Sequence, residues 1–175
     1  MKDFFHISKI TFTVFFVAVV LVGLTGIYKI PKEKSVKQQD TNLESSGAKE
    51  GAIEMAQVER IIDGDTFVIK GGQSVRVLGI DADEKDSLCY EVAKLRLEDA
   101  IGNQVVTLEV GPKDLDVYGR LLRYVFVGDE NISATLVREG LVVAEAPYEG
   151  GRYDQEIAKI ENYAKTNKIG CKWAN

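Results

Sequence analysis

Between residues 57 and 127 the chain alternates short β-branched runs with glycine-containing turns, and this alternation limits the folds open to it. The first runs are VERII, TFVI and SVRVLGI, separated by Asp-Gly at residues 63–64 and by Gly71-Gly72. Valine, isoleucine and threonine favour strands, and a Gly-Gly pair between two such runs is typical of a tight hairpin. The sequence therefore predicts a folded domain of paired strands that begins at Gln57.

Helical patterns interrupt these strands. Residues 88–101 place apolar side chains near helical spacing and end at Gly102, a residue type that often terminates helices. QVVTLEV and LLRYVFV predict two further strands, after which Asn131 can cap a short helix that stops at Gly140. A last helix fits residues 153–165.

Together these elements predict an α+β fold. Five strands with a helix after the third, and about three helices in all, suit a small closed Greek-key barrel of the OB-fold type. Patterning alone does not distinguish such a barrel from an open sheet.

One hydrophobic helix is predicted ahead of this domain. Residues 10–27 carry no charge, and at about 1.5 Å per helical residue they approach the roughly 30 Å core of a bilayer. Lys2 and Lys9 precede the run, as in a secretory signal. Its length favours a signal anchor over residues 1–30, while small residues near its end keep a cleaved signal peptide open.

The next segment, residues 31–56, is polar and carries too few large apolar side chains to offset the entropy of ordering, which predicts a disordered linker. Its lysines act against export under the positive-inside rule, whereas an N-terminal hydrophobic run normally directs export. We expect residues 57–175 to lie outside the cytoplasm, tethered to the cell membrane, or secreted if the segment is cleaved.

Four stretches place charged residues in otherwise apolar surroundings: residues 63–66, Arg76, residues 81–84 and residues 116–120. Each alone is ordinary for a turn, a solvated strand face or a loop. Their order and spacing resemble the staphylococcal nuclease family, through IDGDT, VRVLGIDADE, DVYGRLLRYV and NISATLVREGL. The resemblance covers residues 57–173 and implies a calcium-dependent nuclease that cleaves DNA and RNA to 3′-phosphate products.

The resemblance also implies a metal site. Asp65 and Asp81 would be carboxylate ligands of Ca²⁺, and the backbone carbonyl of Ala82 would complete the protein's share. Oxygen ligands suit this hard cation.

The same resemblance assigns the chemistry. Arg76 and Arg120 would clamp the scissile phosphate, because planar guanidinium groups match phosphate oxygens. Glu84 would accept a proton from the attacking water or orient it. Tyr118 and Tyr148 would pack on the nucleotide, with ordinary packing as the alternative.

Two features depart from the family pattern. The family commonly has Thr-Pro where this chain has Ala82-Asp83, and Val117 stands where a basic residue is common. The added charge of Asp83 would favour a cation and repel a phosphate, so its net effect on substrate binding stays open.

The charge of the domain is unusual for a protein that binds nucleic acid. From Glu50 onward the chain holds 15 basic and 23 acidic side chains, a net charge of −8. Because phosphate neutralisation supplies most of the affinity of such proteins, we expect weak binding that salt weakens further. A local cluster of Arg76, Arg120 and Arg123 would offset part of the deficit.

Cys89 and Cys171 are the only cysteines, too few for a zinc site. They form either a disulfide, which export would favour, or two separate buried thiols.

Two functions are compatible with the sequence: an active nuclease, and a catalytically silent nucleic-acid-binding module of the same fold. Retention of all five charged site residues favours the enzyme. No obligate protein partner is predicted, and the choice between DNA and RNA stays open.

Overall fold

The computed structural model describes residues 48–146 and 150–174. The predicted signal anchor at residues 1–30 and most of the predicted linker lie outside these residues. Among the helices of the described part, none is long and apolar enough to cross a membrane.

Five strands form a closed barrel. They are β1 (Ile53–Ile61), β2 (Thr66–Ile69), β3 (Ser74–Val77), β5 (Val105–Leu115) and β6 (Leu121–Val127). Neighbours in the order β3-β2-β1-β5-β6 pair antiparallel, and the outermost strands β3 and β6 pair parallel, which closes the sheet. This confirms the predicted five-stranded closed barrel over an open sheet. The short β7 (Glu130–Asn131) extends β6.

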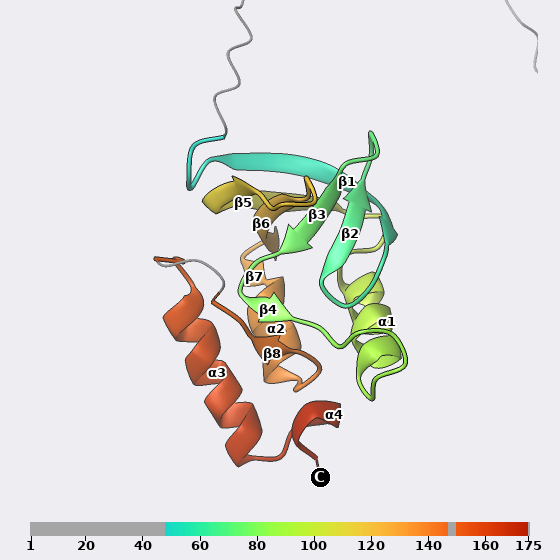
Figure 1. Cartoon of the computed structure of the whole chain (residues 1–175), viewed down its shortest axis with the longest axis vertical. Helices are drawn as coiled ribbons and strands as arrows, with labels where there is room; N and C mark the ends of the chain where they lie inside the picture. Colours follow the sequence, from blue (N-terminus) through green and yellow to red (C-terminus); the bar gives the residue numbers. More distant parts are fainter. Residues whose placement is uncertain (1–47, 147–149, 175) are drawn as a thin grey trace, which may run out of the picture. The chain divides into compact units, whose positions relative to one another are not determined.

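The helices gather at one end of the barrel, below it in Figure 1. They are α1 (Tyr90–Ile101), α2 (Ile132–Arg138), α3 (Asp154–Thr166) and the single turn α4 (Gly170–Trp173). The helix α2 packs against β6 and between α1 and α3. The core joins buried side chains of both layers, including Phe67, Val75, Leu108, Val125, Leu97, Ile101, Leu136 and Ile157.

Local sequence signals act as predicted at two boundaries. Gly71 and Gly72 join β2 to β3 with φ of +107° and +88°, values that residues with a side chain rarely adopt. The side chain of Asn131 accepts a hydrogen bond of 3.3 Å from the backbone N–H of Ala134, which caps α2.

The folded domain begins earlier than predicted. The strand β1 starts at Ile53, whereas the linker was expected to continue to residue 56. Residues 53–57 pair with residues 105–109 of β5, so backbone hydrogen bonds rather than burial hold them in the sheet. Ile53 and Met55 remain exposed, so an apolar pattern that marks burial could not reveal this part of the strand.

A second sheet of two short strands was not predicted. β4 (Ile80–Asp81) pairs antiparallel with β8 (Val143–Ala144), and each strand is too short for a detectable periodicity. The pairing joins the segment that carries Asp81 to the segment between α2 and α3. It thereby adds a wall to the site described next.

Candidate active site

The four charged stretches meet around one cavity of about 160 Å³. Its lining contains the three predicted catalytic residues and the three predicted metal ligands, together with two further acids. The lining residues are Asp63, Asp65, Arg76, Asp81, Ala82, Asp83, Glu84 and Arg120.

Strand pairing brings these residues together. Thr66, at the start of β2, lies opposite Arg76 of β3, so Asp65 at the preceding position lies beside the same strand. The parallel pairing of β3 with β6 brings Arg120, the residue before β6, to this region. These two strand pairings bring Asp65 and Arg120, which are 55 residues apart in the sequence, to the same cavity.

Asp65 is buried, with 6% of its surface exposed. Its Oδ1 accepts a hydrogen bond of 2.9 Å from the Thr66 hydroxyl, and its Oδ2 accepts one of 2.7 Å from the Ala82 N–H. Burial raises the pKa of Asp65 to about 6, against the opposing effect of the Arg76 guanidinium. Burial thus makes the ionised form of this carboxylate costly, and a nearby cation would favour it.

Arg76 is the most heavily bonded side chain of the site. Its Nη1 donates to the carbonyl oxygens of Val77 and Ile80, both at 2.6 Å. Its Nη2 donates to Asp81 Oδ1 at 3.1 Å and to Glu145 Oε2 at 3.2 Å. Its Nε lies 3.3 Å from Asp65 Oδ1. These contacts fix the plane of the guanidinium inside the barrel mouth.

Arg120 is held differently, by its own turn. Its Nε donates to Asp116 Oδ2 at 2.6 Å, and its Nη1 lies 3.3 Å from the Thr66 hydroxyl oxygen. Partial burial opposes ionisation of Asp116, but hydrogen bonds from the side chain and backbone of Arg120 hold its pKa below the ordinary value. Within the described residues, Nη2 of Arg120 has no hydrogen-bond partner, which leaves it available to a ligand.

Glu84 lines the cavity as an exposed side chain. No hydrogen bond from another described residue restrains its carboxylate, whereas its carbonyl oxygen accepts the N–H of Ser87 at 3.1 Å. The predicted role in orienting water is therefore compatible with its position and stays a prediction.

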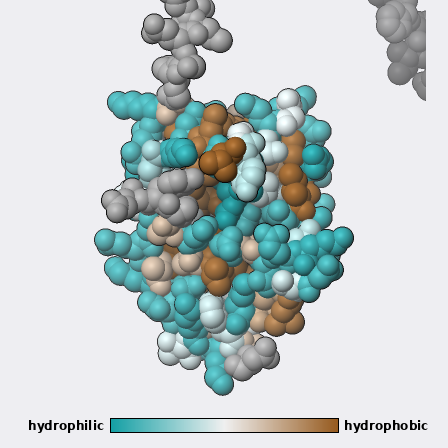
Figure 2. Space-filling view, in the orientation of Figure 1, coloured by the Kyte–Doolittle hydropathy of each residue, from teal (hydrophilic) through white to brown (hydrophobic). Residues whose placement is uncertain are grey.

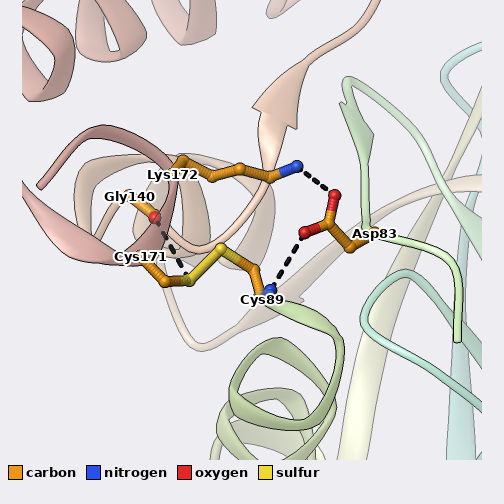
Figure 3. Close-up of a disulfide and its surroundings, with 5 residues drawn as sticks. All are labelled: Asp83, Cys89, Gly140, Cys171 and Lys172. Carbon is orange, nitrogen blue, oxygen red and sulfur yellow. Dashed lines mark hydrogen bonds and ion pairs between the residues drawn. A yellow bond between two sulfur atoms is a disulfide. The ribbon is translucent and has the colours of Figure 1, made fainter. Parts of the chain in front are cut away.

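Asp83 also lines the cavity, but its carboxylate is already paired within the fold. Figure 3 shows its carboxylate between the Lys172 ammonium and the backbone nitrogen of Cys89. Oδ2 accepts the Cys89 N–H at 3.0 Å, and Oδ1 accepts from Lys172. The hydrogen bond from Lys172 holds the pKa of Asp83 below its ordinary value. Its charge is therefore paired within the fold.

Cys89 and Cys171 form a disulfide, the first of the two sequence alternatives. It links the N-cap of α1 to α4 across 82 residues, with the Cα atoms 5.6 Å apart. In Figure 3 the disulfide lies next to the pair formed by Asp83 and Lys172. Both links end on the segment that follows the predicted metal ligands.

A second cavity, of about 250 Å³, adjoins the first. Arg76 and Arg120 line both cavities, and Tyr118, Val117 and Glu145 belong to the second. Tyr118 is 82% exposed, and the Arg120 guanidinium lies 5.5 Å from its ring centre, a position open to a flat ligand. The other predicted nucleotide contact, Tyr148, lies outside the described residues.

Arg123 does not join the predicted arginine cluster. Its side chain is 2% exposed and pairs with Glu54 at 2.7 Å and Asp114 at 2.8 Å. The alternation of β6 turns it to a different face from its neighbours, so only two arginines line the cavity.

The sequence of this chain is similar to those of several nucleases. Residues 74–175 match the sequence profile described as staphylococcal nuclease homologue. The thermonuclease of Staphylococcus intermedius is 31% identical over 93% of this chain and 96% of its own length. The thermonuclease of Staphylococcus hyicus is 31% identical over 75% and 82%, and endonuclease YncB of Bacillus subtilis is 35% identical over 64% and 58%. The chain belongs to the staphylococcal nuclease family.

The predicted metal ligands of this staphylococcal nuclease homologue can be compared with the oxygen donors that a hard cation such as Ca²⁺ prefers. Among the described residues, no three acidic, histidine or cysteine side chains converge as a metal cluster. The predicted set contains only two carboxylates, Asp65 and Asp81, and both lie against one guanidinium, at 3.3 Å and 3.1 Å. All donors are oxygen, and Asp65 is buried, so the residues fit a hard cation by donor chemistry.

Two site residues of this family member were missed from the sequence. Asp63 lies in the turn that was recognised, but its Oδ1 accepts the Asp65 N–H at 3.1 Å and shapes that turn. Glu145 carries no local signal, because it reaches Arg76 only through the β4–β8 pairing.

Proposed function

We propose that this protein is a nuclease that hydrolyses phosphodiester bonds in DNA and RNA with the help of Ca²⁺ and leaves 3′-phosphate ends. The observation that carries the proposal is the single cavity in which Asp65, Asp81 and Glu84 face Arg76 and Arg120. The names of its relatives, thermonuclease and endonuclease, agree with this activity.

Asp65, Asp81 and the carbonyl of Ala82 would hold the Ca²⁺ ion. When bound, the ion supplies positive charge that stabilises the developing charge on the phosphate oxygens and on the attacking oxygen. The N–H of Ala82 already bonds Asp65, so the backbone at this position is held close to the buried carboxylate.

The arginines would bind the phosphate. Nη2 of Arg120 has no hydrogen-bond partner among the described residues, and Asp116 holds the side chain, so the guanidinium is in place to bind a phosphate oxygen. Glu84, exposed and unrestrained, would take the proton of the attacking water. Tyr118, on the rim of the adjoining cavity, would contact the nucleotide next to the scissile phosphate.

We further propose that the domain works outside the cytoplasm, either anchored by residues 1–30 or released by cleavage. The disulfide between Cys89 and Cys171 supports this location, since disulfides persist mainly in oxidising compartments.

The test is cleavage by the full-length protein of single-stranded DNA and of RNA, with Ca²⁺ and then with a chelator. Cleavage should require Ca²⁺, and Glu84→Gln and Arg120→Ala should each lower kcat by roughly 100-fold or more. Glu98→Gln, an exposed acid on α1, is the matched control and should retain full activity. Binding of DNA without cleavage by the wild-type protein would instead support the silent module.

A further inference from the structure

The terminal nitrogens of Arg76 have no vacant donor. Each carries two N–H bonds, and the two of Nη1 are directed at the carbonyls of Val77 and Ile80. The short 2.6 Å distances anchor that side of the guanidinium to the backbone. A phosphate can therefore reach Arg76 in bidentate fashion only along the edge formed by Nε and Nη2.

Three carboxylates occupy that edge. Asp65 lies 3.3 Å from Nε, while Asp81 and Glu145 accept from Nη2 at 3.1 Å and 3.2 Å. Asp65 and Asp81 are the predicted ligands of the cation, and their charge would be balanced by that ion as well as by Arg76. Glu145 has no such second partner among the described residues, and it stays on Arg76 until a phosphate displaces it.

Glu145 is held in this position by its backbone. It directly follows β8, and its N–H donates to the carbonyl of Gly79 at 3.0 Å. Its side chain is 43% exposed and lines the cavity of about 250 Å³ next to the reactive one. The carboxylate thus lies in a cavity that shares Arg76 and Arg120 with the first one, where a negative charge would repel a phosphate that approaches Arg76.

We propose that Glu145 acts as an internal competitor of the substrate phosphate for Arg76 and sets the affinity of this enzyme for nucleic acid. The inference rests on the proposed nuclease function. Phosphate binding exchanges one anion for another on Nη2, so the gain in free energy is smaller than at a vacant arginine. Glu145 is a residue that tunes affinity and takes no part in the reaction at phosphorus.

Steady-state kinetics of full-length Glu145→Gln with single-stranded DNA and Ca²⁺ test the proposal. KM should fall by roughly threefold to tenfold with kcat little changed, because a charge that opposes binding has been removed. Glu139→Gln is the matched control, since Glu139 also pairs with an arginine, Arg96, and is 37% exposed, but lines neither cavity. An unchanged or higher KM for Glu145→Gln would overturn the proposal.

A binding series separates competition from general repulsion. In a Glu84→Gln background, which prevents turnover, the dissociation constant of a fluorescent single-stranded DNA is measured by anisotropy with Ca²⁺ present. Glu145→Gln should tighten binding when Arg76 is present and have little effect when Arg76→Ala is added. An equal gain in both backgrounds would assign the effect to net charge and contradict competition at Arg76.

The two hypotheses fail in different ways. If wild-type protein cleaves DNA but Glu145→Gln leaves KM unchanged, only the role of Glu145 is wrong. If folded wild-type protein leaves DNA and RNA intact with Ca²⁺, the proposed function is wrong, and the binding series still reports on the competition for Arg76.

Discussion

At the residue scale, burial disfavours the ionised form of Asp65, which is the form that the predicted metal site requires. Asp65 is hydrogen-bonded to Thr66 and Ala82 yet buried enough for its pKa to rise from 3.8 to about 6. Below pH 4 both the folded and the unfolded chain carry a protonated Asp65. Between pH 4 and about 6, only the folded chain keeps this proton. The contribution of Asp65 to the free energy of unfolding is therefore lost as the pH rises through about 6.

The substitution Asp65→Asn tests this effect of burial on stability. The amide of Asn does not titrate, so without metal the free energy of unfolding of the variant relative to the wild-type protein should be about 1 to 3 kcal/mol higher at pH 7 than at pH 4.5. Its nitrogen cannot accept the hydrogen bonds that the Asp65 oxygens accept from Thr66 and Ala82, which is a separate cost. Chemical denaturation in the presence of chelator, at pH 4.5 and pH 7, measures this difference. Ca²⁺ should stabilise the wild-type protein and leave Asp65→Asn unaffected; equal stabilisation of both would remove Asp65 from the metal site.

At the element scale, the segment between β4 and α1 depends on a distant element, α4. Residues 81–84 contain Glu84 and the predicted metal ligands Asp81 and Ala82, but residues 82–89 belong to no strand or helix. The disulfide to Cys171 and the ion pair from Lys172 fasten this segment at two neighbouring points. The turn α4 therefore fastens the segment that carries the predicted site residues Asp81, Ala82 and Glu84.

Removing the covalent link should affect both stability and activity. Cys89→Ala combined with Cys171→Ala should lower the free energy of unfolding by about 4 kcal/mol, because the unfolded chain regains the freedom of a long loop. Urea denaturation measures the loss, and kcat measured at a temperature where the variant remains folded should also fall. Retained stability and activity would show that the ion pair alone holds the segment.

The ionic link can be tested separately. Lys172→Met keeps most of the side-chain volume but leaves the carboxylate of Asp83 unpaired, so kcat should fall more than KM changes. Lys172→Arg preserves the charge and should restore most of the activity. If Lys172→Met matches the wild-type protein in kcat, Lys172 has no part in positioning the segment.

At the scale of the whole molecule, the net charge of the domain is unfavourable for binding nucleic acid. The domain carries a net charge of −8 from Glu50 onward, and most of the face drawn in Figure 2 is hydrophilic. Arg123, which was predicted to add positive charge at the site, is buried and paired with Glu54 and Asp114. Among the described residues that line the two cavities of the site, Arg76 and Arg120 are the basic ones.

Added salt should weaken the binding of nucleic acid further. KM for DNA should be high and should increase with NaCl, while the slope of log KM against log salt should stay small, because few phosphates are neutralised. Steady-state assays between roughly 20 mM and 200 mM NaCl measure the slope. A tight complex that salt does not weaken would contradict the proposed mode of binding.

The sequence by itself predicted the strand runs and the order of most elements, and its resemblance to the family named most of the residues that line the cavity. The closure of the sheet came from the pairing of β3 with β6. Glycine pairs, the Asn131 cap and β-branched runs encode local structure, because they act through neighbouring residues. The IDGDT and DVYGR stretches were recognisable in the same way. Each is short and continuous, so its signal survives without knowledge of the fold.

Only the tertiary structure decided where the charges point. Asp83 turns to Lys172, Arg123 is buried, and Glu145 reaches Arg76 across 69 residues of chain. The early start of β1 also depends on its pairing with β5. These contacts join residues far apart in sequence, and their partners are selected by strand pairing and packing, which no local pattern of residues encodes.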